Sequence, residues 1–248
     1  MQIQVNAVIF DWGNTLCHSP FKRVLEKKND EFLEILNKRD YPIDKEKLFD
    51  TWFKADTETK FPHHSHSFQE EKTVRQALKY MGVTAPHIRE MCPKLLDVYM
   101  EGVKDVMTND PHNQEVRLAF EDLRSRGKKI AIFSNGRSKV PITWLEWAGI
   151  PKEWFTFILA SEEVEIEKPD LRIFGLIADR AGEPVDKCVY VGNDPIKDIN
   201  PALGYGMKTI LYKTPEEYRR EKLTEKYNQG TSADATITKF SELKEIII

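Results

Sequence analysis

Short runs of apolar residues recur in two parts of the chain, and each run stops at a polar residue or a glycine. The three clearest runs are residues 7–10 before Asp11, residues 130–133 before Ser134, and residues 188–191 before Gly192. Runs that are apolar at every position are typical of strands buried on both faces, as in a parallel sheet. Further strands are predicted at 155–159 and, from weaker patterns, at 209–212 and 235–237.

Helical periods separate these runs. The apolar positions of 116–123 repeat at intervals of three and four, and Gly127 follows where such a helix would end. Residues 171–177 repeat in the same way after Pro169, a residue favoured at a first helical position, and 241–248 predicts a last short helix. Because strand and helix alternate, the predicted fold class is α/β, with a parallel sheet covered by helices on both faces.

Residues 18–106 carry almost no strand pattern. Apolar positions at helical spacing predict helices near 21–36, 48–53, 74–81 and 88–103. Gly82 would end the third of these helices, and Pro93 is a possible break in the last. The pattern predicts a helical domain at 18–106, inserted directly after the first strand, and a core domain formed by 1–17 and 107–248.

Composition narrows the class of protein. The 248 residues are 40% hydrophobic and 31% charged, which is typical of a folded domain. The formal net charge is −3 with Lys and Arg spread along the chain, which argues against a nucleic-acid partner. No apolar run approaches the roughly 20 residues of a membrane span, and the start lacks a signal-peptide pattern. Three widely spaced cysteines form no disulfide framework or zinc pattern, so we expect a cytoplasmic protein without a membrane partner.

Polar side chains follow the predicted strands and should meet, because ligands of parallel α/β sheets gather at the carboxyl ends of the strands. The candidates are Asp11, Ser134, Asn135, Gly136, Lys168, Asn193, Asp194 and Asp198. They would bring carboxylates, a hydroxyl with backbone amides, and an ammonium into one pocket. Such a set can hold a hard divalent cation together with a phosphoryl group.

In this order, the segments resemble the four motifs of the haloacid dehalogenase superfamily. Residues 10–16 (FDWGNTL) are similar to the first motif, 134–136 to the second, 168–170 to the third, and 191–194 with Asp198 to the fourth. The resemblance covers most of 1–17 and 107–248, and the helical insert lies where this family places a cap. It implies a Rossmann-like parallel-sheet core with an inserted all-helical cap domain.

The resemblance also implies an activity, that of a magnesium-dependent phosphohydrolase acting on a small phosphorylated metabolite. Asp11 would attack phosphorus and form an aspartyl phosphate, which water then hydrolyses. Ser134 and the amides of Asn135 and Gly136 would hold the phosphoryl oxygens, while Lys168 would bind the substrate and offset charge. The implied ligands of Mg²⁺ are Asp11, the backbone carbonyl of Gly13, Asn193 or Asp194, and Asp198.

Two positions depart from the family pattern. Family phosphatases carry a second Asp two residues after the nucleophile as the general acid, and here that position is Gly13. The fourth motif usually has Asp directly after its glycine, and here Asn193 precedes Asp194. A general acid typically raises the rate by about 10²–10⁴-fold, so its absence leaves three explanations. The leaving group needs no proton, as in an acyl phosphate, or another residue supplies the proton. The third explanation is that the reaction is not phosphoester hydrolysis. The candidate donors are His18, His63, His64 and His66.

Three alternatives follow from these departures. Phosphonate-cleaving members carry a small residue at the position of Gly13, and residues 11–13 are similar to theirs. Dehalogenases carry an aromatic residue there and work without metal, and 134–136 is also similar to their second motif. The retained pair Asp194 and Asp198 favours a metal and therefore ranks dehalogenation lower. The alternative from another class is a catalytically weak member kept for binding, because both acid positions are altered.

Overall fold

The computed structural model describes residues 2–59, 69–215 and 232–248. It divides the chain into two compact units, Met1–Ser19 with Met107–Ile248, and Pro20–Val106. We call them the core unit and the helical unit. These units divide between residues 19 and 20 and between 106 and 107. The sequence pattern placed the domain boundaries between 17 and 18 and between 106 and 107.

The core unit contains a six-stranded sheet in the order β3-β2-β1-β4-β5-β6, and every neighbouring pair is parallel. The strands are β1 (Ala7–Phe10), β2 (Lys129–Ser134), β3 (Phe157–Ala160), β4 (Cys188–Gly192), β5 (Lys208–Tyr212) and β6 (Ala235–Ile237). The predicted parallel α/β fold is confirmed. Phe10 of the central strand β1 pairs with Ile132 and with Val191, so the carboxyl ends of β1, β2 and β4 lie at one edge of the sheet.

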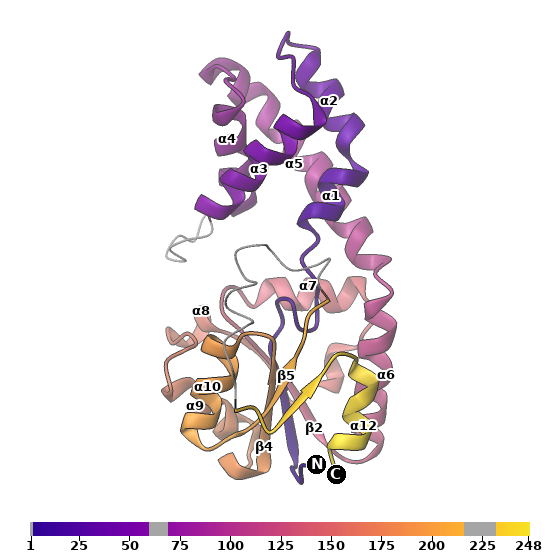
Figure 1. Cartoon of the computed structure of the whole chain (residues 1–248), viewed down its shortest axis with the longest axis vertical. Coiled ribbons are helices and arrows are strands. Elements are labelled where there is room, and N and C mark those ends of the chain that lie inside the picture. The colour runs from indigo at the N-terminus through magenta and orange to yellow at the C-terminus, as the bar shows by residue number, and fades with distance from the viewer. Residues whose placement is uncertain (1, 60–68, 216–231) are drawn as a thin grey trace. The chain divides into compact units, whose positions relative to one another are not determined.

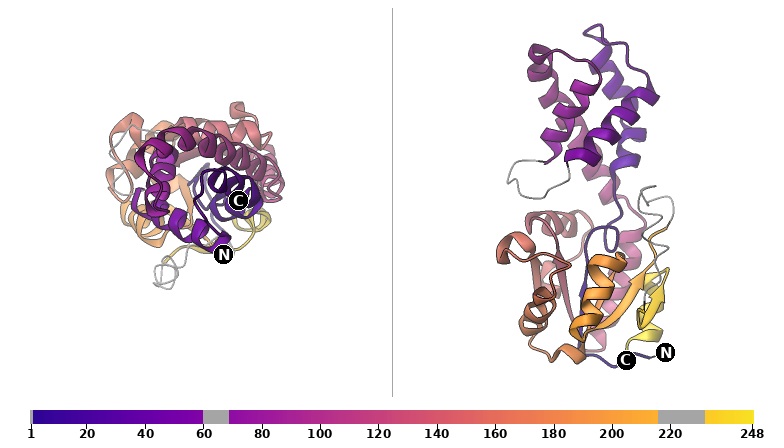
Figure 2. Two further views of the ribbon diagram at one scale, coloured as in Figure 1. Left: turned by 90° about the horizontal axis from the view of Figure 1, so that it is seen from above. Right: turned by 60° about the vertical axis from the view of Figure 1, so that its left-hand side comes forward.

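Helices cover both faces of this sheet (Figures 1 and 2). On one face, Tyr190 of β4 belongs to an apolar cluster with Phe174 of α9 (Arg172–Ala181). On the other face, the ring of Phe10 packs on Phe120 of α6 (His112–Ser125), with ring centroids 5.2 Å apart. Among the described residues, the core unit further contains α7 (Lys139–Trp147), α8 (Ser161–Val164), α10 (Asn200–Tyr205) and α12 (Leu243–Ile246). It also contains the 3₁₀ turns Lys152–Trp154, Val185–Lys187 and Phe240–Glu242, and a π-helical turn at Pro195–Ile199.

The start of α9 differs from the prediction. Pro169 is not its first residue, because the helix begins at Arg172. The Lys168–Pro169 peptide is cis. The carboxylate of Asp170 accepts the backbone N–H of Arg172 at 3.0 Å, and a side-chain acceptor of this kind stabilises the first turn of a helix. The helix therefore begins three residues after Pro169, beside the contact between Asp170 and Arg172.

The helical unit contains α1 (Phe21–Lys27), α2 (Asn29–Asn37), α3 (Lys45–Thr59), α4 (Gln69–Tyr80) and most of α5 (Ala85–Thr108). Trp52 lies at its centre, with ring centroids 4.8 Å from Phe32 and 5.6 Å from Tyr99. The predicted break at Pro93 is wrong, because α5 continues through it. A proline removes one helical hydrogen bond, and the buried side chains on both sides keep the helix together. None of the described helices is long and apolar enough to cross a membrane.

Candidate active site

The loop after β1 carries Asp11 and is held by its own backbone. The carbonyl of Trp12 accepts the N–H groups of Leu16 and Cys17, each at 3.0 Å. Asn14 takes the left-handed conformation at φ 57°, which asparagine tolerates better than most residues. Upstream of this turn, the N–H of Asp11 donates to the carbonyl of Val191 at 2.8 Å and so fixes the base of the loop to β4.

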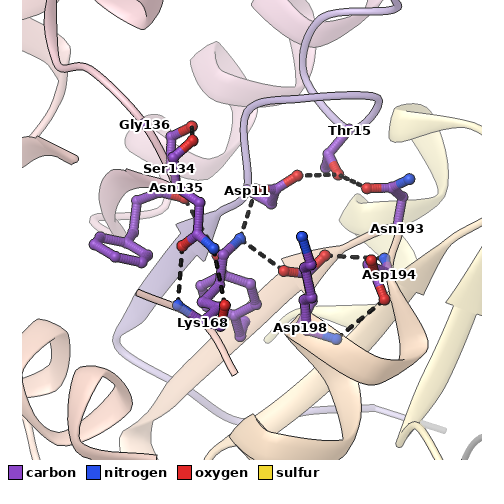
Figure 3. Close-up of polar contacts among 12 residues, drawn as sticks. Asp11, Thr15, Ser134, Asn135, Gly136, Lys168, Asn193, Asp194 and Asp198 are labelled. Carbon is purple, nitrogen blue, oxygen red and sulfur yellow. Dashed lines mark hydrogen bonds and ion pairs between the residues drawn. The ribbon is translucent and has the colours of Figure 1, made fainter. Parts of the chain in front are cut away.

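The ammonium of Lys168 links its own segment to the loop of Asp11 and to the segment that contains Tyr190 and Asp198 (Figure 3). Its Nζ donates to three oxygens: Oδ1 of Asp11 at 2.6 Å, Oδ1 of Asp198 at 2.7 Å, and the hydroxyl of Tyr190 at 2.8 Å. An ammonium has three N–H donors, so all of them are used. Lys168 is 4% exposed, Asp11 7% and Asp198 1%, which makes these contacts a buried network.

Burial and charge set the protonation of this network. Burial raises the pKa of Asp198 to about 7, against the lowering effect of Lys168. Burial alone would lower the pKa of Lys168, but the carboxylates of Asp11 and Asp198 hold it well above its usual value. Burial also raises the pKa of Tyr190 well above its usual value, so its phenol stays protonated and donates to the carbonyl of Phe133 at 3.2 Å. One fixed cation thus lies between two carboxyl groups.

Asp198 approaches the backbone at the end of β4. A Cβ added to Gly192 would lie 2.6 Å from the Cβ, the Cγ and Oδ2 of Asp198, so only glycine fits there. Oδ2 of Asp198 also accepts the N–H of Asp194 at 2.9 Å. The close approach to the backbone of Gly192 and the hydrogen bond from the N–H of Asp194 orient the carboxyl group of Asp198 toward Lys168.

Asn193 and Asp194 have different surroundings. Oδ1 of Asp194 accepts the N–H groups of Ile196 and Lys197 at 2.9 and 3.0 Å, which caps the π-helical turn. Oδ1 of Asn193 lies 3.3 Å from the hydroxyl of Thr15, which in turn lies 3.1 Å from Oδ2 of Asp11. The amide of Asn193 therefore belongs to the network around Asp11, while the carboxylate of Asp194 binds its own helix.

The predicted second motif is tied to the third. The side chain of Asn135 makes two hydrogen bonds with the backbone of Lys168, donating to its carbonyl at 2.8 Å and accepting its N–H at 2.9 Å. Ser134 is buried at the end of β2, and α7 begins only at Lys139, so Ser134 is not a helix cap. The N–H of Gly136 already donates to the hydroxyl of Ser161 at 2.9 Å, which the sequence did not predict.

Oxygen donors are present for a hard cation. Within the described ranges no group of three or more His, Cys, Asp or Glu is suited to a metal ion. The available donors are instead the carboxylates of Asp11 and Asp198, the amide oxygen of Asn193, and the backbone carbonyl of Gly13. Carboxylate, amide and carbonyl oxygens are the ligands that magnesium prefers, so the chemistry of the donor set fits this ion.

Of the four histidines considered as proton donors, the structure describes His18. His18 is buried, its ring stacks on His112 with centroids 4.0 Å apart, and its Nε2 lies 3.0 Å from the hydroxyl of Tyr212. His63, His64 and His66 lie outside the described residues. Sequence reasoning placed Thr15 in the first motif without giving it a role, and it missed Tyr190, since a tyrosine inside an apolar run carries no distinguishing signal.

The motifs and their geometry define a family. The model of haloacid dehalogenase-like hydrolases matches residues 5–204, and the chain belongs to this family of hydrolases. It is 33% identical over 130 residues to a glyceraldehyde 3-phosphate phosphatase of Methanothermobacter thermautotrophicus, covering 51% of this chain and 54% of that protein. It is 27% identical over 140 residues to a phosphoserine phosphatase of Thermus thermophilus, covering 56% and 53%. The chain spans about half the length of the curated relatives it matches.

The likeness to solved structures extends over nearly the whole chain. The chain is similar to the crystal structure of a 2-haloacid dehalogenase from Pseudomonas syringae pv. Tomato DC3000, with a TM-score of 0.58 and 22% sequence identity. The match covers 99% of this chain and 97% of the dehalogenase chain. At that identity the likeness concerns the fold alone.

Proposed function

We propose that this chain is a magnesium-dependent phosphohydrolase that acts on a small phosphorylated metabolite. The observation that carries the proposal is the buried contact of Lys168 with both Asp11 and Asp198, at 2.6 and 2.7 Å. A nucleophilic carboxylate, a cation that offsets its charge, and a second carboxylate for a metal thereby meet at one edge of the sheet. The names of the two curated relatives support the same class of reaction.

In this proposal Asp11 attacks phosphorus, and Lys168 attracts the phosphoryl group through its charge, because its three N–H donors are engaged. Oδ1 of Asp11 is held by Lys168 and Oδ2 by Thr15, so the carboxylate has a fixed orientation before substrate arrives. Lys168 offsets the charge of the carboxylate and of the phosphoryl group as they approach each other. The hydroxyl of Ser134 and the backbone N–H of Asn135 bind phosphoryl oxygens. Water then hydrolyses the resulting aspartyl phosphate. Gly136 joins them only if its bond to Ser161 opens.

Magnesium, when bound, would neutralise charge on the phosphoryl oxygens. Asp11, Asp198, the carbonyl of Gly13 and the amide of Asn193 would hold it. Between the two open candidates we favour Asn193, because the carboxylate of Asp194 is held by two backbone N–H groups of its own turn. We also propose that the helical unit serves as the cap that selects the substrate.

The test is turnover of an aryl phosphate with magnesium and with a chelator. We expect phosphate release that requires magnesium and that Asp11→Asn reduces by about 10³-fold or more, because the amide is not a nucleophile. Asp179→Asn on the exposed surface of α9 is a control that removes a carboxylate outside the site and should retain turnover. Equal turnover by Asp11→Asn would reject the proposal. Halide release from a 2-haloacid in the presence of chelator would instead identify a dehalogenase.

A further inference from the structure

Gly13 lies two residues after the proposed nucleophile, and neither its backbone nor its surroundings require glycine. A Cβ added there meets no heavy atom of the described residues within 4 Å, outside its chain neighbours. The left-handed conformation of this turn belongs to Asn14, at φ 57°. Gly192 is the opposite case, because a Cβ there would lie 2.6 Å from Asp198. Packing among the described residues and backbone conformation would therefore both accept a side chain at position 13.

The side chains of Lys168 and Thr15, which are hydrogen-bonded to Asp11, have their N–H and O–H donors engaged. All three N–H donors of Lys168 are used, and the hydroxyl of Thr15 lies between Asp11 and Asn193. Tyr190 donates to the backbone carbonyl of Phe133. Lys168 and Thr15 therefore have no further N–H or O–H to give to a departing oxygen.

We propose that Gly13 determines the substrate class: the site acts on phosphoryl donors whose leaving group departs as a stable anion, such as an acyl, enol or aryl phosphate. This rests on the proposed phosphohydrolase function. It separates the chain from the two relatives described above, which are named for glyceraldehyde 3-phosphate and phosphoserine, both alkyl phosphates. The open space at position 13 is the place that such a leaving group occupies.

The reaction balances without a general acid. In the first step an Asp11 oxygen forms a bond to phosphorus, and the bond from phosphorus to the leaving oxygen breaks. That oxygen keeps the electron pair and departs as a carboxylate, enolate or phenolate. In the second step water adds to phosphorus, the bond to Asp11 breaks, and both protons of the water stay on the product as dihydrogen phosphate. The Asp11 carboxylate is regenerated.

The test compares leaving groups in the full chain with magnesium. For the parent protein, we expect kcat/KM to fall steeply across substituted aryl phosphates as the pKa of the phenol rises, and to be at least about 100-fold lower for glycerol phosphate than for acetyl phosphate. Gly13→Asp places a carboxyl group in the open space and should raise kcat/KM for glycerol phosphate by about tenfold or more. Gly13→Asn, of matched size but without an acid, should leave the ratio of alkyl to aryl turnover at the parent value.

Similar rates of the parent protein on alkyl and aryl phosphates would overturn the proposal, because a proton donor would then come from elsewhere. A folded Gly13→Asp variant with an unchanged ratio would overturn it as well. If that variant does not fold, the leaving-group series with the parent protein decides alone. Failure of the proposed function looks different: no substrate of the series would then release phosphate in a reaction that depends on Asp11.

Discussion

At Gly192 the backbone of β4 leaves no room for a side chain beside Asp198. We expect Gly192→Ala to displace the carboxyl group of Asp198, because its Cβ would lie 2.6 Å from three atoms of that residue. Asp198 would then lose its contact with Lys168, and magnesium affinity and turnover should fall by about 10–100-fold. Magnesium titrations of activity, with thermal unfolding to check the fold, measure this.

Gly204→Ala is the matched control for that variant. Gly204 lies in α10, and its added Cβ would meet only Leu171, at an ordinary 3.9 Å. Alanine is favoured over glycine in a helix by about 1 kcal/mol, so the control should keep full activity with equal or higher stability. Equal activity losses in both variants would show that the close contact with Asp198 has no special importance.

Tyr190 positions Lys168 from inside the sheet. Tyr190→Phe removes the hydroxyl at 2.8 Å and leaves one N–H of a buried ammonium without its acceptor. A hydrogen bond to a charged group contributes about 1.5–3 kcal/mol, so we expect kcat to fall by about tenfold or more. Tyr212→Phe loses an equally buried hydroxyl, which contacts His18, and should change kcat less. A lower Tm with unchanged kcat in Tyr190→Phe would limit this tyrosine to a structural role.

At the scale of elements, α6 is joined to the C-terminal segment through Glu115. Its Oε1 accepts the N–H of Phe240 at 2.7 Å, and its Oε2 lies 3.5 Å from Nδ1 of His112. The hydrogen bond with His112, together with backbone N–H groups near Phe240, lowers the pKa of Glu115 from 4.5. The charged form is therefore bound more tightly in the folded protein. Its stabilisation is present above about pH 4.5 and is lost as the pH falls through the lower folded value.

Glu115→Gln should therefore be less stable than the parent protein at pH 7, by about 0.5–1 kcal/mol, since the Glu115 side chain is partly exposed and only His112 is buried. The difference should shrink as the pH falls below 4.5, because the parent glutamate then becomes protonated. Urea unfolding at pH 7 and near pH 3.5 measures both values. Glu121→Gln on the same helix removes an exposed pair with Arg117 and should show a smaller difference at pH 7. A difference for Glu115→Gln that is constant with pH contradicts the assignment.

At the scale of the whole molecule, each unit has its own apolar core. The core unit packs α9 on one face of the sheet and α6 on the other, while the helical unit packs around Trp52. The helical unit is inserted between β1 and α6, directly after the loop that carries Asp11. That loop is held by bonds within the core unit, such as the one from the hydroxyl of Thr214 to the carbonyl of Asn14 at 2.7 Å. The orientation of Asp11 is therefore set by the core unit's own contacts.

The sequence by itself determined the elements and the residues that end them. Buried strands are apolar at every position and helices repeat at three and four, so the six strands and the inserted helical segment are visible locally. One error concerns Pro169, because α9 begins only at Arg172, whose N–H donates to the carboxylate of Asp170. The run at 155–159 likewise predicts a strand that the structure begins at Phe157.

Only the tertiary structure decided which groups touch. The strand order places β1 between β2 and β4, and this brings Lys168 to Asp11 across 157 positions of sequence. It also turns Tyr190, one residue of an apolar run, into a partner of that lysine, and leaves Asp194 as a helix cap. The physical reason is that hydrophobic periodicity specifies which face of an element is buried, while contacts between side chains depend on which elements become neighbours.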